Sequence, residues 1–244
     1  MHCRPHPLTP SPQVERRDYL FDIGLEELWA DMRLHNLYGR HLGLKGNYEV
    51  LLAKKDAKAV KLVEFVNELK AEIVQENILR GKGLARFFKA KGEGNNLFVL
   101  DQEYTFPRMN KNNLCLADFV DDEVCFFVVT CGTGVAKKCA ELISKGEYLK
   151  AHTVAAMALV AVEGMAEYVH EKIRELWGIG TKEGIRVSFG YPVCPDLENQ
   201  KKLFALLKPE AKIGVSLTEG FMMKPEASIS AMVLKNDKAK GILK

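Results

Sequence analysis

The residues with the clearest chemical potential lie in the segment Gly184–Asp196, which reads Gly-Ile-Arg-Val-Ser-Phe-Gly-Tyr-Pro-Val-Cys-Pro-Asp. In an extended strand, Arg186, Ser188 and Gly190 point to one face, because side chains alternate with a period of two. The apolar residues between them then face a core. An arginine grips a carboxylate with two parallel N–H groups, and glycine lets a ligand lie against the backbone. The segment suits a small carboxylated ligand, although an edge strand entering a turn explains the same pattern.

Two acidic residues are embedded in apolar runs elsewhere in the chain. Asp118 lies within 114–120, and Glu163 lies within 160–165. A carboxylate in such surroundings is costly unless it is paired or exposed. Together with Arg186, the two acids offer what an amino-acid moiety needs: acceptors for its ammonium and a fork for its carboxylate. Asp118 is equally well explained as a turn or helix cap, and Glu163, with Glu167 on the same helix face, as facing solvent.

A second motif follows the apolar run 124–129, where Thr130-Cys-Gly-Thr-Gly134 precedes a helical pattern. Strand, glycine loop and helix in this order resemble a phosphate-binding unit. The third glycine is missing, and no acidic residue ends a following strand about 20 residues on. A tight turn is therefore favoured over a Rossmann-type site. The sequence also contains no Ser-His-Asp arrangement, HExxH motif or P-loop, and its histidines are scattered.

Composition limits the classes of function. The 244 residues are 47% hydrophobic and 27% charged, with a net charge of +3, which together with the lack of a basic run argues against nucleic acid. No apolar run approaches the roughly 18 residues that span a bilayer, and no secretory leader is visible. The six cysteines form no CxxC pair, so we expect reduced thiols, a cytoplasmic location and no membrane.

Domain organisation follows from proline content and apolar periodicity. Residues 1–17 carry four of the nine prolines and are expected to form a disordered tail, in which His2, Cys3 and His6 make only a weak metal-ligand set. Residues 18–244 are expected to form a single domain. Helices are predicted over 19–39, 54–78, 135–144 and 151–177. Strands are predicted over 84–90, 97–100, 124–129, 185–189, 213–217 and 228–234, and the first two of these strands are expected to form a hairpin. This order indicates an α+β domain with a mixed or mostly antiparallel sheet covered by helices.

Several segments together resemble one family. The pattern Gly-Ile-Arg-x-x-x-Gly-Tyr-Pro-x-Cys-Pro over 184–195 is similar to the signature of the activation domain of cobalamin-dependent methionine synthase. The similarity continues, in the family's order, at 116–119, 163–170, 217–221 and 225–228. The resemblance implies a helmet-shaped fold with a central antiparallel sheet and a shallow groove for S-adenosylmethionine. It further implies that the domain supplies the methyl group that rescues cob(II)alamin, with an electron from a flavodoxin-like or ferredoxin-like donor.

The resemblance also assigns roles to individual residues. Asp118 and Glu163 match acidic ligand contacts, and Arg186 matches the arginine near the methionyl carboxylate. Ser188 and Gly190 match backbone contacts. Tyr191 matches the tyrosine beside the methyl-transfer site. No catalytic acid or base and no metal ligand is implied.

The chain departs from the family pattern in three respects. It has no modules for homocysteine or folate, no Asp-x-His-x-x-Gly segment, and no aromatic residue within 236–244, where the family places tyrosines against the nucleoside. We therefore expect cobalamin to be carried by a partner, either a cobalamin-binding methionine synthase or another corrinoid protein, on which this chain acts in trans. The alternatives are a non-catalytic docking subunit that has lost S-adenosylmethionine binding, and a Rossmann-type methyltransferase that uses Gly132 and Gly134.

Overall fold

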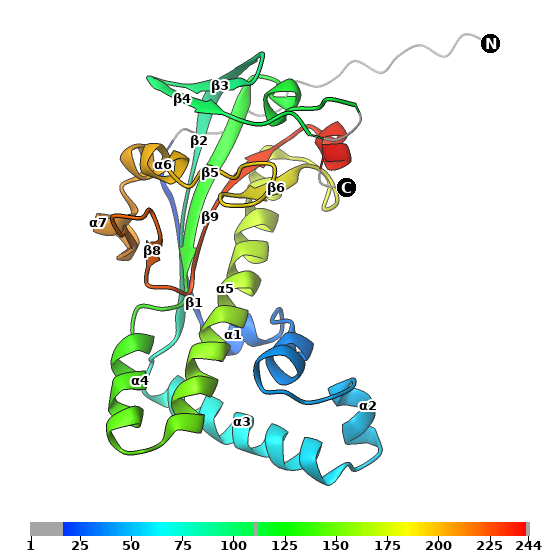
Figure 1. Ribbon diagram of the computed structural model, residues 1–244, viewed down its shortest axis with the longest axis vertical. Helices are drawn as coiled ribbons and strands as arrows, with labels where there is room; N and C mark the ends of the chain where they lie inside the picture. Colours follow the sequence, from blue (N-terminus) through cyan, green and yellow to red (C-terminus); the bar gives the residue numbers. More distant parts are fainter. Residues whose placement is uncertain (1–16, 110–111, 243–244) are drawn as a thin grey trace, which may run out of the picture.

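One antiparallel sheet organises the molecule (Figure 1). The computed structural model describes residues 17–109 and 112–242; the tail expected over 1–17, with its candidate metal ligands, lies outside this part except for Arg17. Seven strands follow the order β4-β3-β2-β5-β9-β6, with β1 also paired to β2, and every described pair is antiparallel. The strands are β1 Tyr19–Gly24, β2 Arg80–Glu93, β3 Asn96–Val99, β4 Gln102–Thr105, β5 Glu123–Thr130, β6 Ile185–Ser188 and β9 Ser228–Leu234. A separate pair is formed by β7 Ser216–Leu217 and β8 Met223–Lys224.

Helices cover both faces of this sheet. The 30-residue helix α5, Tyr148–Trp177, runs along one face, and α6 and α7 lie across from it (Figure 1). The other helices are α1 Leu25–Trp29, α2 Tyr48–Ala53, α3 Ala57–Gln75, α4 Val135–Ser144, α6 Asn199–Leu207 and α7 Pro209–Ile213. Three short helical turns complete the set: η1 Asn36–His41, η2 Leu116–Phe119 and η3 Asp237–Ile242. The α+β class expected from the sequence is confirmed.

Strand β5 divides the interior into two cores. Its odd-numbered residues from Cys125 to Val129 pack in a cluster with α1, α3 and α5, and its even-numbered residues from Val124 to Val128 pack in a second cluster with α6. All six side chains are fully buried. An unbroken apolar run is the sequence a strand needs when both faces are covered, which confirms the prediction for 124–129.

The same alternation orients β6, which is the outermost strand on its side of the sheet. Ile185 and Val187 are buried in the α6-side core, whereas Arg186 and Ser188 are only partly buried. The strand and its two-face pattern were predicted correctly. Placing the polar face of β6 beside α5 is what brings Arg186 close to that helix.

Two predicted elements were wrong in whole or part. The helix expected to begin at residue 19 is instead β1 followed by the short α1, because Tyr19, Phe21 and Ile23 alternate with more exposed residues and pair in register with β2. In the predicted strand 213–217, α7 continues to Ile213 and only Ser216–Leu217 is extended. The hairpin is confirmed, with Glu93 opposite Asn96.

One described helix, α5, is long and apolar enough to cross a membrane by length and composition alone. However, 67% of its most apolar window is buried within the fold, where it packs on the sheet. Burial in a core is sufficient to explain an apolar helix of this length. The described cysteines are all free thiols, as expected, and all but Cys139 are buried.

The docking of η2 on β2 depends on the absence of a side chain at Gly92. A Cβ atom there would overlap the carbonyl oxygen of Ala117, a backbone atom in η2 that cannot rotate away. We expect Gly92→Ala to lower the free energy of unfolding by about 2 kcal/mol or more, the usual scale of overpacking. Gly24→Ala is the control, because nothing lies within 4 Å of its Cβ position and its φ of −71° is open to any residue. Urea titrations that show the same loss of unfolding free energy for Gly92→Ala and Gly24→Ala would contradict the proposed role of Gly92.

Candidate functional site

A tight turn after β6 shapes the rim of the site. The Gly190 N–H donates to the Cys194 carbonyl at 2.9 Å, and the Cys194 N–H donates to the Tyr191 carbonyl at 2.8 Å. Gly190 has a φ of +89°, a conformation that side-chain-bearing residues rarely adopt. The turn leaves the Tyr191 side chain 58% exposed. Burial, followed by the charge of Asp196, raises the pKa of the Cys194 thiol to about 12, so this thiol remains protonated and is not a nucleophile.

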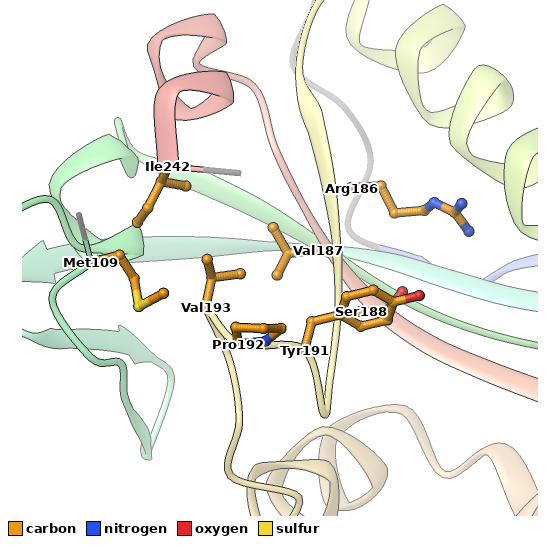
Figure 2. Close-up of a pocket in the computed structure, with 8 residues that line it drawn as sticks. All are labelled: Met109, Arg186, Val187, Ser188, Tyr191, Pro192, Val193 and Ile242. Carbon is orange, nitrogen blue, oxygen red and sulfur yellow. The ribbon is translucent and has the colours of Figure 1, made fainter. Parts of the chain in front are cut away.

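A cavity of about 500 Å³ lies along β6 and this turn (Figure 2). Its two ends differ in chemistry. Arg186 extends toward the helix, while Met109, Val193 and Ile242 form an apolar end on the other side of the strand (Figure 2). Ser188 and Tyr191 also line the cavity, so three of the six residues expected from the sequence meet here.

A second cavity, of about 520 Å³, adjoins the first on the α5 side. Arg186 and Tyr191 line both cavities, which places them at the boundary. Glu163 enters from α5, and the remaining wall is largely polar. It comprises Arg33, Asn36, Arg40, His41, Glu226 and Ser228, with apolar residues from α5 and β9.

Arg186 has an incomplete set of partners. Its Nη2 atom lies 3.7 Å from Oε2 of both Glu163 and Glu167, close enough for ion pairing but too long for a hydrogen bond. Its Nη1 atom is buried and has no hydrogen-bond partner among the described residues. An unsatisfied buried donor costs about 1–3 kcal/mol, and more when it is charged. The arginine is therefore arranged to receive an acceptor.

Asp118 is engaged elsewhere. Arg108 donates to its two carboxylate oxygens at 3.0 and 3.1 Å, and the Cys115 N–H donates to Oδ2 at 2.9 Å, which caps η2. Partial burial raises the pKa of this carboxyl, but the Arg108 and Cys115 hydrogen bonds outweigh it, so the pKa lies below its usual value. Asp118 lines neither cavity; it anchors the segment that supplies Met109 to the first one.

The sequence reasoning missed several residues that line the cavities. Met109 and Ile242 come from segments that carry no recognisable motif, and Asn36 comes from a turn predicted as regular helix.

His170 was set aside with the other histidines, yet its Nδ1 atom lies 3.9 Å from Oε1 of Glu167. The helical spacing of residues 163, 167 and 170 is the signal that would have grouped it with the two glutamates.

The glycine loop after β5 does not form a nucleotide-binding unit. Antiparallel neighbours flank β5 on both sides, whereas a Rossmann-type site requires a parallel sheet. Gly132 and Gly134 instead allow close packing, against Pro225 and the Ile78 backbone respectively. No group of three or more potential metal ligands occurs within residues 17–109 and 112–242.

His170 makes stability depend on pH. Burial, then the charges of Arg174 and Arg186, lowers its pKa from 6.5 to about 3. Below pH 6.5 the unfolded chain gains a proton that the folded chain takes up only near pH 3, so stability falls across this window. At about 1.4 kcal/mol per pH unit, the loss from this group by pH 5 is about 2 kcal/mol.

His170→Gln should remove this contribution. Urea titrations at pH 7 and pH 5 check the expectation, with the exposed His35→Gln as the control. The wild type and the control should lose about 2 kcal/mol more than His170→Gln on acidification. Equal losses in all three proteins would contradict the assignment.

Comparison with known proteins now identifies the fold and family. The family model for "Vitamin B12 dependent methionine synthase, activation domain" matches residues 32–242. The methionine synthases of Mycobacterium tuberculosis and Mycobacterium leprae are each 32% identical over 195 residues, an alignment that covers 63% of this chain and 16% of each relative. The chain thus corresponds to a small part of those proteins.

A solved structure shares the fold. It is described as the MetH reactivation domain bound to AdoHcy, and it matches with a TM-score of 0.83 over 93% of this chain and 80% of the other, at 23% identity. With the family model spanning nearly all described residues, the chain belongs to the family of vitamin B12-dependent methionine synthase activation domains.

Proposed function

We propose that this chain binds S-adenosylmethionine along β6 and supports reductive reactivation of a corrinoid carried by another polypeptide. The observation that carries the proposal is Arg186, whose side chain lines the polar end of a cavity with an apolar opposite end and whose guanidinium has an Nη1 without a hydrogen-bond partner among the described residues. A guanidinium with a free N–H is the group that a ligand carboxylate needs. The related solved domain was bound to AdoHcy, the thioether that remains when S-adenosylmethionine gives up its methyl group.

The cavity fits such a ligand in size and polarity. Its volume of about 500 Å³ lies within the usual range for small-molecule sites. Arg186 would take the carboxylate and Glu163 the ammonium, since the Glu163 carboxylate is 52% exposed and can move toward a ligand. Met109, Val193 and Ile242 would pack against the nucleoside. Of these, Ile242 lies in the segment 236–244, where the resemblance would place aromatic side chains against the nucleoside.

The turn residues would set the position of the ligand's reactive end. Ser188 would offer a backbone contact from the cavity wall, whereas Gly190 lines neither cavity and donates its N–H to the Cys194 carbonyl. The exposed Tyr191 forms the rim that a corrinoid would face. Asp118 contributes to binding only by exchange, because a ligand ammonium would have to replace the Arg108 guanidinium on its carboxylate.

No proton transfer is needed from this chain. The corrinoid of the partner, once reduced by one electron from a separate donor, would supply the nucleophile that takes the methyl group from the sulfonium sulfur, and S-adenosylhomocysteine would be the leaving group. The residues of this chain would orient the methyl donor, S-adenosylmethionine, and exclude water. Such positioning is the source of the rate gain in a reaction of this kind.

Calorimetry with S-adenosylmethionine and S-adenosylhomocysteine tests the binding site. Arg186→Ala should weaken binding roughly 10- to 150-fold, which corresponds to the loss of a charged hydrogen bond. Arg80→Ala is the matched control, because Arg80 is paired with Asp22 and lines neither cavity. The binding proposal is rejected if the wild type shows no heat with millimolar ligand.

Reactivation in trans needs a separate test. The chain is mixed with a cobalamin-dependent methionine synthase from which the activation domain has been removed, together with a flavodoxin-like or ferredoxin-like donor. Recovery of the methylcobalamin spectrum should require wild-type chain and S-adenosylmethionine, and should fall at least tenfold with Arg186→Ala. Complex formation that is unaffected by Arg186→Ala, without any recovery, would instead favour the docking-subunit alternative.

A further inference from the structure

We propose that Glu167 is a positioning residue that holds Arg186 from behind while a ligand carboxylate occupies its front. The proposal rests on the proposed function, in which Arg186 binds the ligand. It arises from the unequal surroundings of Glu163 and Glu167, which lie one helical turn apart on α5. The Oε2 atoms of both glutamates lie 3.7 Å from Nη2 of Arg186.

The Glu167 carboxylate is held on both sides. Its Oε2 atom faces Arg186, whereas Oε1 lies 3.6 Å from Nη1 of Arg174 and 3.9 Å from Nδ1 of His170. Arg174 is itself fixed, since its Nε donates to the Glu183 carbonyl at 2.8 Å. Glu167 therefore stands between Arg186 on one side and, on the other, Arg174 and the buried His170, neither of which lines the cavities.

Glu163 has no comparable anchor. Its side chain is more exposed, at 52% against 43% for Glu167, and Arg186 is its only ion-pair partner among the described residues. Two carboxylates four residues apart on a helix repel each other, and a ligand carboxylate at Arg186 adds a third negative charge. The repulsion is relieved most easily by moving the carboxylate with the fewest partners. Glu163 is thus free to turn toward the ligand ammonium, and Glu167 remains on the guanidinium.

The buried His170 lies beside the same Glu167 carboxylate. His170 is 3% exposed, its Nε2 atom has no hydrogen-bond partner within the described part of the chain, and its Nδ1 atom lies 3.9 Å from Oε1 of Glu167. At 3.9 Å the contact is too long for a hydrogen bond, so a neutral imidazole bounds one side of the carboxylate without adding a competing charge. Glu167 thereby links a fixed core group to the arginine that extends from β6 toward α5 (Figure 2).

The experiment compares Glu167→Gln with Glu171→Gln, which makes the same charge change at an exposed position one turn further along α5. Calorimetry uses S-adenosylhomocysteine, and thermal unfolding checks that each variant is folded. Glu167→Gln should weaken binding about tenfold, because Arg186 loses the charged neighbour that positions it, and Glu171→Gln should not. Wild-type affinity in Glu167→Gln would overturn the proposal.

Two further measurements separate positioning from general destabilisation. With the decarboxylated analogue of S-adenosylhomocysteine, Glu167→Gln and the wild type should bind equally, because the ligand no longer uses Arg186. The double variant Glu167→Gln/Arg186→Ala should bind S-adenosylhomocysteine no more weakly than Arg186→Ala alone. A loss that persists with the analogue, or that adds to Arg186→Ala, would show that Glu167 does not act through Arg186. If the wild type binds neither ligand, the proposed function itself fails.

Discussion

A sheet with two apolar faces must be covered twice, and this constraint determines where Arg186 and its neighbours on α5 lie. Strand β5 is buried on both sides, so helices must pack on each face of its neighbours. The long α5 covers one face and extends along the sheet toward β6 (Figure 1). Because β6 is an outer strand, its polar face meets α5 at a margin where water and ligands have access.

The charges at this margin are arranged loosely. An arginine that is 18% exposed faces two glutamates at distances longer than hydrogen bonds, and one of its N–H groups has no described partner. A fully paired guanidinium would be more stable but would not exchange partners readily. The unsatisfied donor is therefore a local cost, which the two well-packed cores offset, and it leaves capacity for binding.

The division between rigid and movable groups follows from the same packing. On α5, the neighbours of the arginine differ, since Glu163 is half exposed whereas Glu167 lies beside the buried His170. The residues in front, on the turn after β6, are exposed, as Tyr191 shows.

The sequence by itself determined a great deal about local structure. The apolar run of β5, the alternation in β6, the hairpin and the three long helices were all visible, because periodicity reports which faces of an element are buried. The family signature over 184–195 led to the family that the comparisons identified. The strand β1 was missed because six alternating residues before a short helix resemble the start of one long helix.

Only the tertiary structure decided which of these residues meet. It brought Arg186 to Glu163 and Glu167, but it left Asp118 bound to Arg108 at the cap of η2, a pairing that no local pattern announces. It also supplied the apolar end of the cavity from Met109 and Ile242, which are more than a hundred residues apart in the chain. Periodicity describes each element relative to its own neighbours, whereas the contacts of a site depend on how separate elements pack, and that is set by the whole fold.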